Sequence, residues 1–154
     1  MERINHQKEG KWYDRQPGTL KGRQIMVVVL LKCCPFHQCG TLEYLPRFLE
    51  TADYVVNLLP NTPQTQNIWN ATLFARMKPT AVFIDAGQGS AVVDIDLITS
   101  LEQKQLAGAV IDVYRKEPLP SEYPFWRTQE LLLTSHSAAP SLAYMLLLNF
   151  FVTI

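Results

Sequence analysis

The sequence predicts an α/β protein built around a parallel β-sheet. Short apolar runs alternate along the chain with segments of helical, amphipathic pattern, which is the rhythm of strands joined by right-handed helical crossovers. The apolar runs lack a polar residue at every second position, which is typical of strands buried on both faces. Because 47% of the 154 residues are hydrophobic and only 18% are charged, the chain is expected to fold as one domain of this class.

Five strands are expected, and each is an apolar run. The first is RQIMVVVLL at residues 23–31, which is rich in β-branched residues. The other four runs are Tyr54–Leu59, Ala81–Asp85, Ala107–Val113 and Glu130–Thr134.

Three helices are expected between these strands. Pro46 suits the first turn of the first helix, and Asp94 is expected to cap the third. The residues predicted to face the sheet are Leu45, Phe48 and Leu49 in the first helix, Leu73, Phe74 and Met77 in the second, and Leu97, Ile98 and Leu101 in the third.

Charge and composition exclude several classes of function. Fourteen basic residues balance fourteen acidic ones, so a nucleic-acid partner is not expected. The first fifteen residues are polar and do not form a signal peptide. The apolar stretch near the end is about half the length of a membrane span. We therefore expect a soluble cytoplasmic protein with no membrane partner.

The three cysteines lie together in KCCPFHQC, residues 32–39, beside His37. These residue types can bind a metal ion, but the ligands of a zinc site usually come in pairs from separated turns. The alternative is that Cys33, Cys34 and Cys39 are free thiols in a reducing compartment, and this alternative is preferred. No metal is predicted.

The carboxyl ends of the strands are the place to expect a ligand in such a sheet. The segments that follow the second to fifth strands are Pro60-Asn61-Thr62-Pro63, Gly87-Gln88-Gly89, Asp112 with Glu117-Pro118, and Ser135-His136-Ser137-Ala138. One glutamate and one histidine should therefore meet at the same edge. A carboxylate beside an imidazole raises the imidazole pKa and selects its tautomer, as proton transfer requires.

Four spaced motifs in this order resemble the nicotinamide-dependent D-2-hydroxyacid dehydrogenases, and most closely their glyoxylate/hydroxypyruvate reductase branch. The motifs are ADYVVNLLPNTPQT (52–65), GQGSAVVDIDLITSL (87–101), AGAVIDVYRKEPLP (107–120) and LLLTSHSAAPS (131–141). A weaker likeness extends to Trp12 and to LKGRQIMVVV (20–29). The resemblance implies a Rossmann-like cofactor domain, NAD or NADP as cofactor, and hydride transfer at C2 of a small 2-keto or 2-hydroxy acid.

The resemblance also implies roles for individual residues. His136 would exchange a proton with the C2 oxygen, and Glu117 would hydrogen-bond His136 and keep it protonated. Asp112 would bind the nicotinamide carboxamide. The residues that would line the cofactor, besides Asp112 and His136, are Leu59, Pro60, Ala86, Gly87, Gln88 and Ala138.

The chain departs from the family pattern at three places. Gln88 occupies the position of the family's substrate-binding arginine, and a neutral side chain there should lower catalytic efficiency at least tens-fold. The first strand runs into a stretch with Gly40 alone, where the family has a GxGxxG phosphate loop. Without that loop the Rossmann-like cofactor domain is expected to be incomplete, and the family's substrate domain is expected to be missing as well.

The expected organisation is an N-terminal arm or linker (1–22), an NAD-binding-like domain (23–141) and an apolar C-terminal helix (142–154). The predicted function is a 2-hydroxyacid dehydrogenase with weak or no activity. The alternative is a non-enzymatic binding module that pairs through its apolar C-terminal helix and its polar arm, Met1 to Tyr13, or an inactive fragment. The module would form a homodimer, or a heterodimer with a full-length relative. A third possibility is that the abrupt join at residues 32–40 is an artefact of splicing or gene assembly.

Overall fold

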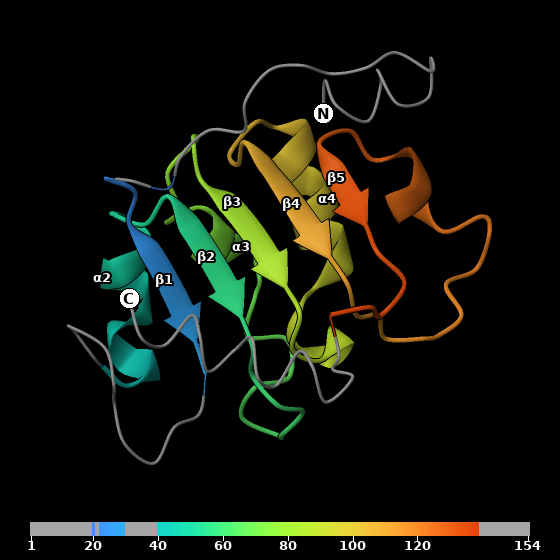
Figure 1. Ribbon diagram of the computed structural model, residues 1–154, viewed down its shortest axis with the longest axis horizontal. Helices are drawn as coiled ribbons and strands as arrows, with labels where there is room; N and C mark the ends of the chain where they lie inside the picture. The colour runs from blue at the N-terminus through green and yellow to red at the C-terminus, as the bar shows by residue number, and fades with distance from the viewer. Residues whose placement is uncertain (1–19, 21, 30–39, 139–154) are drawn as a thin grey trace.

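The computed structural model describes residue 20 and residues 22–29 and 40–138. They form a five-stranded sheet whose strands lie side by side in sequence order, all parallel (Figure 1). The strands are β1 (Ile25–Val28), β2 (Tyr54–Asn57), β3 (Val82–Asp85), β4 (Gly108–Ile111) and β5 (Leu131–Leu133). The predicted parallel α/β fold is confirmed. Each strand is shorter than its apolar run because residues such as Leu59 and Val113 are buried in the loops that follow the strands.

Helices connect the strands at the predicted places. Their bounds are η1 (Leu42–Tyr44), α2 (Leu45–Leu49), α3 (Ala71–Phe74), η2 (Gly89–Ala91), α4 (Asp94–Glu102) and η3 (Pro124–Arg127). Pro46 lies in the first turn of α2, as predicted. α3 ends at Phe74, so Met77 reaches the core from the turn after the helix. The Asn70 side chain caps α3 by accepting hydrogen bonds from the Thr72 and Leu73 amides.

The predicted capping role of Asp94 is wrong. The N-cap of α4 is Val93, which makes no side-chain cap hydrogen bond, and Asp94 is the first residue inside the helix. The Asp94 carboxylate accepts a hydrogen bond from the Tyr123 hydroxyl and lies 3.8 Å from Arg115 Nε. Partners from the segment after β4 therefore hold this side chain away from the helix amides.

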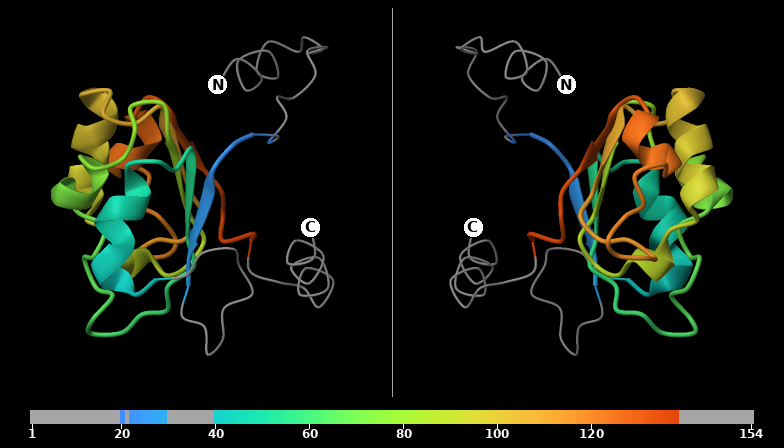
Figure 2. Two further views of the ribbon diagram at one scale, coloured as in Figure 1. Left: turned by 90° about the vertical axis from the view of Figure 1, so that its left-hand side faces the viewer. Right: turned by 90° about the vertical axis from the view of Figure 1, so that its right-hand side faces the viewer.

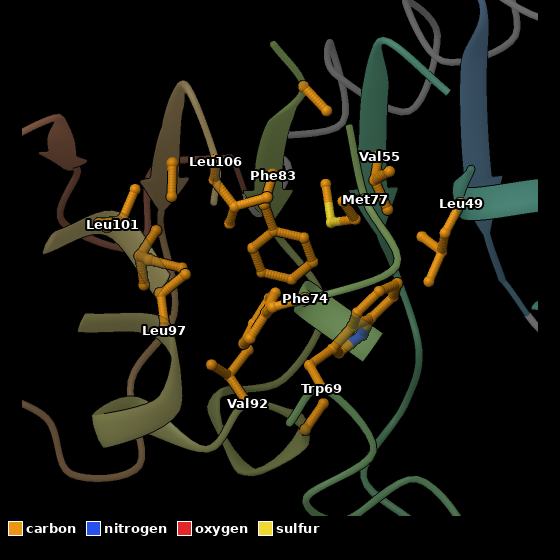
Figure 3. Close-up of a cluster of buried hydrophobic side chains, with 14 of the residues drawn as sticks. Leu49, Val55, Trp69, Phe74, Met77, Phe83, Val92, Leu97, Leu101 and Leu106 are labelled. Carbon is orange, nitrogen blue, oxygen red and sulfur yellow. The ribbon is translucent and has the colours of Figure 1, made fainter. Parts of the chain in front are cut away.

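The core lies between the sheet and the helices, and all the described helices cover one face of the sheet (Figure 2). Three aromatic rings occupy its centre (Figure 3). The Phe83 ring centroid is 4.8 Å from that of Trp69 and 5.3 Å from that of Phe74, and all three side chains are fully buried. Truncating any one of them to alanine would cost about 3–5 kcal/mol.

The other face of the sheet, called the outer face below, carries the alternate residues of each strand. Apart from Gly108, which is buried, these residues are exposed or half-buried, and no described helix covers them (Figure 2). They are Ile25, Val27, Tyr54, Val56, Val82, Ile84, Gly108, Val110 and Leu132. The sequence predicted strands covered on both faces, and the described part of the chain covers only one.

Some sequence-based predictions lie outside the described residues. They are the cysteine cluster at 33–39 with His37, nearly all of the predicted arm at 1–22, and the predicted helix at 142–154. Among the residues that the structure does describe, no helix has the length and apolar character needed to cross a membrane.

Candidate active site

A buried pair of polar side chains stabilises the turn after β3. Asn57 and Asp85 end β2 and β3 in register, and neither is exposed to solvent. Asn57 Nδ2 donates to Asp85 Oδ1 over 2.8 Å, and the Gly87 amide donates to the same oxygen over 3.1 Å. Asp85 Oδ2 has no hydrogen-bond partner among the residues that the structure describes. Burial raises the pKa of Asp85 to about 6, against the opposing effect of the two hydrogen bonds.

Close backbone packing sets the path of this turn. A Cβ atom on Gly87 would lie 2.8 Å from the Leu59 carbonyl oxygen, and one on Gly89 would lie 2.2 Å from the Tyr114 carbonyl carbon. Both distances exclude any side chain, so the glycines let the turn pack against the ends of β2 and β4. Gln88 lies between them in an extended conformation, with its side chain exposed. The turn thus presents Gln88 at the carboxyl edge of the sheet.

Asp112, just after β4, anchors the loop that follows β5. Its Oδ1 accepts hydrogen bonds from the Thr134 hydroxyl and from the Ser137 amide, the latter over 2.9 Å, and its Oδ2 accepts from the Ala138 amide over 2.8 Å. Burial works to raise the pKa of Asp112, but these hydrogen bonds outweigh it and lower the pKa below its ordinary value. Both oxygens are engaged within the protein in this conformation.

Glu117 and His136 meet at this edge, as predicted. His136 Nδ1 lies 2.9 Å from Glu117 Oε2 and 3.1 Å from Oε1, and the Tyr114 amide donates to Oε1 over 3.0 Å. The hydrogen bond with Glu117 raises the pKa of His136, and the same bond lowers the pKa of Glu117. The two side chains are 42% and 38% exposed, so solvent and a ligand can reach them.

The backbone of His136 is held in an unusual conformation. Its φ is +52°, in the left-handed region, which costs a non-glycine residue roughly 1–2 kcal/mol. Asp112 fixes the next two amides, and the Tyr114 hydroxyl donates to the Thr134 carbonyl over 2.6 Å. These contacts on both sides of His136 aim its ring at Glu117.

An open cavity of about 800 Å³ adjoins the His136–Glu117 pair. Tyr114, Leu119 and Trp126 form apolar parts of its wall, and residues 134–137 form a polar part. A protonated imidazole at the edge of such a cavity can donate a proton to an oxygen of a bound molecule.

The remaining residues predicted to line the cofactor differ in how exposed they are. Pro60 is exposed, while Ala86 and Ala138 are half-buried at the same edge of the sheet. The Leu59 side chain is fully buried in the core, so only its backbone lies near the Gly87 turn.

Sequence reasoning missed Asn57, Asp85 and Arg115. A polar residue at the end of each of two neighbouring apolar runs was the available signal for the first two. Arg115 donates to the carbonyl oxygen of Val92 and to the Asn67 side chain, and so connects the loop of Glu117 to the segment after Gln88. No signal in the sequence pointed to this role of Arg115, because an arginine in a loop is usually exposed to solvent.

The residues present match a nicotinamide dinucleotide site only in part. The cavity of about 800 Å³ is lined by His136 and Glu117, and Gln88 is not among the residues that line it. The chain between β1 and η1 contains one glycine, Gly40, and a Cβ atom there would meet the Phe48 ring at 3.0 Å. A pyrophosphate loop needs several glycines before its helix, and this stretch of sequence contains one.

Comparisons with known proteins agree on one family. Residues 35–138 match the model of the D-isomer specific 2-hydroxyacid dehydrogenase, NAD binding domain. Over 100 residues, or 65% of this chain, the sequence is 46% identical to a glyoxylate/hydroxypyruvate reductase A of Serratia proteamaculans, and it covers 32% of that protein. The corresponding protein of Yersinia enterocolitica is 39% identical over 100 residues. The chain thus spans about a third of the length of these relatives.

Solved structures give the same result. An NADPH-dependent glyoxylate/hydroxypyruvate reductase from Sinorhizobium meliloti in apo form superposes with a TM-score of 0.76 at 26% identity, over 97% of this chain and 70% of that one. A structure of that enzyme with NADP and sulfate gives a TM-score of 0.74 over 97% of this chain and 57% of that one. A phosphoglycerate dehydrogenase from Lactobacillus plantarum gives 0.78 at 27% identity, over 92% and 55% of the two chains.

Proposed function

The chain belongs to the D-isomer specific 2-hydroxyacid dehydrogenase family, and we propose that it retains the proton-transfer half of an oxidoreductase site for small 2-keto and 2-hydroxy acids. The observation that supports this proposal best is the His136–Glu117 pair, with a 2.9 Å contact, at the carboxyl edge of the sheet. The proposed reaction is the reduction of a 2-keto acid, such as glyoxylate or hydroxypyruvate, to the 2-hydroxy acid. A bound nicotinamide cofactor would supply the hydride.

In this reaction His136 gives a proton to the C2 oxygen of the substrate. Glu117 engages Nδ1, which leaves Nε2 to donate to the substrate. Because Glu117 raises the pKa of His136, the imidazolium form persists to higher pH than in a free histidine. Reduction requires that form, so the pair keeps the proton donor available up to a higher pH.

Asp112 acts in the proposed site as a positioning residue for His136, since its two oxygens hold the amides of residues 137 and 138. Its binding of a nicotinamide carboxamide stays a prediction, as do the cofactor contacts of Pro60, Ala86, Gly87, Gln88 and Ala138. Leu59 would contribute through its backbone alone. NAD and NADP are both open as cofactors.

Gln88 weakens the proposed site. A charge-assisted hydrogen bond to a substrate carboxylate contributes about 1.5–3 kcal/mol, and a neutral amide loses most of this contribution. The sequence after β1 also contains one glycine before η1, so we expect a pyrophosphate to be bound weakly. We therefore expect turnover to be weak or absent.

Steady-state kinetics with glyoxylate and hydroxypyruvate, with either reduced dinucleotide, test the proposal. Gln88→Arg should raise kcat/KM at least tens-fold if the substrate binds at all. Gln103→Arg, which adds the same charge at the exposed end of α4, is the matched control and should change nothing. His136→Gln should abolish any activity. Turnover of the unmodified chain at the level of a full-length relative would contradict the predicted impairment.

Titration with NADH and NADPH separates weak catalysis from weak cofactor binding. A dissociation constant in the micromolar range would mean that the N-terminal part of the chain forms a cofactor site without a GxGxxG motif. We expect weaker binding than this. No binding at millimolar dinucleotide, together with no effect of Gln88→Arg, would contradict the proposed enzymatic function. It would not contradict the fold or the family membership.

The second candidate is a non-enzymatic binding module that forms a homodimer, or a heterodimer with a full-length relative. The supporting observation is β1, an edge strand of the described sheet with Ile25 and Val27 exposed. Such an edge offers unpaired backbone groups to a second strand. Light scattering after size exclusion tests this candidate, and a monomer at all concentrations would exclude the homodimer.

A further inference from the structure

The outer face of the sheet is continuous and apolar. Eight side chains lie on it, in register across five strands: Ile25, Val27, Tyr54, Val56, Val82, Ile84, Val110 and Leu132. None of them is charged. The exposed fraction reaches 48% at Ile25 on one edge and 38% at Leu132 on the other.

A parallel sheet with this composition is normally covered on both faces, since every residue on a bare face leaves apolar area in water. The described helices all lie on the opposite face (Figure 2). The cover must therefore come from chain outside the described residues or from another molecule.

We propose that residues 142–154 pack across the outer face and complete the second layer of the domain. Their sequence, LAYMLLLNFFVTI, contains no charged residue and matches the character of the face. As a helix this segment would be about 20 Å long, and five strands span about 19 Å. The length of the segment thus suits the width of the sheet.

The point of attachment favours the same arrangement. The segment begins four residues after Ala138, whose amide is bound to Asp112 at the carboxyl edge of β4. A tether this short keeps the segment close to the sheet and raises its effective concentration there.

The other undescribed segments suit the face less well. Residues 1–19 carry charges throughout. Residues 30–39 connect β1 to η1, and at about 3.3–3.6 Å per residue they are too short to span five strands and return. Neither residues 1–19, which are charged, nor residues 30–39, which are short, are therefore suited to cover the centre of the outer face.

Photo-cross-linking in the full chain tests this proposal. p-Benzoylphenylalanine replaces Ile84 at the centre of the outer face, or Ile95, which is 64% exposed on α4, as the matched control. An equal mixture of ¹⁴N- and ¹⁵N-labelled protein separates contacts within one chain from contacts between two copies. A second probe at Val56 covers the possibility that the Ile84 variant does not fold.

The expected product joins position 84 or 56 to a peptide from residues 142–154 of the same chain, several times more abundantly than the product from position 95. Products of mixed isotope content would assign the face to a second copy and overturn the proposal. Cross-links to residues 1–19, or none from either outer-face position, would overturn it as well.

Discussion

Replacing Asp85 by asparagine should remove the part of the pH dependence of stability that comes from the buried Asp85 carboxyl group. Asp85 is fully buried, and its pKa is raised from 3.8 to about 6. Asparagine keeps one oxygen as the acceptor for Asn57 Nδ2 and the Gly87 amide. It removes the charge without changing the size of the side chain.

The sign and size of the effect follow from the pKa. A carboxyl group whose folded pKa is raised contributes stability that is complete below its unfolded pKa and is lost as the pH rises through about 6. A shift of about two pH units corresponds to about 3 kcal/mol, of which about 2 kcal/mol falls between pH 4.5 and pH 7.5. The free energy of unfolding of Asp85→Asn, relative to the unmodified protein, should therefore be about 2 kcal/mol higher at pH 7.5 than at pH 4.5.

Urea unfolding followed by tryptophan fluorescence, with Trp69 in the core, measures these free energies at both pH values. Glu102→Gln removes one negative charge from the exposed end of α4 and controls for net charge. An equal difference between Asp85→Asn and the unmodified protein at the two pH values would refute the reasoning. It would show that Asp85 is not strained by burial in its ionised form.

Three further changes have definite expected outcomes. Glu117→Gln should lower the pKa of His136 in an NMR titration, because it removes the hydrogen bond that raises this pKa, and an unchanged midpoint would contradict the pairing. Gly89→Ala should reduce the free energy of unfolding by about 1–3 kcal/mol or more, since its Cβ would overlap the Tyr114 carbonyl group, and thermal unfolding at the unmodified temperature would show that the turn can shift. Asn70→Ala should cost about 1 kcal/mol in urea unfolding through loss of the α3 cap, whereas Asn70→Asp should cost little.

Much of the fold could be predicted because its strands are contiguous apolar runs. The five runs became β1 to β5 in sequence order, and α/β alternation implied the parallel arrangement. Strand ends were less predictable, since Leu59 and Val113 are as buried in loops as they would be in strands. Asp94 was misread because an acidic residue suits both the N-cap and the first turn of a helix, and contacts with Tyr123 and Arg115 decide between them.

The site was predictable where it depends on strand ends and less so where it depends on packing. Glu117 and His136 follow neighbouring strands, so their meeting was implied by the order of the sheet. The Asn57–Asp85 network depends on register between two strands, which a single sequence does not reveal. Similarly, Asp112 was expected at the site, but its hydrogen bonds to residues 134–138 required the path of that loop.

The contacts of Asp112 have a consequence for how such a domain can be inherited. Asp112, Glu117 and His136 all lie on one uninterrupted stretch from β4 to the loop after β5, and they orient one another through their own hydrogen bonds. A deletion or recombination upstream of β4 would carry this acid–base unit intact into a new protein. In the proposed function, dinucleotide binding would also need β1 and the turns after β2 and β3, so such a break would remove part of that proposed site. The hydrogen-bonded arrangement of these three residues therefore depends on one contiguous segment, whereas the Asn57–Asp85 pair depends on two separate strands.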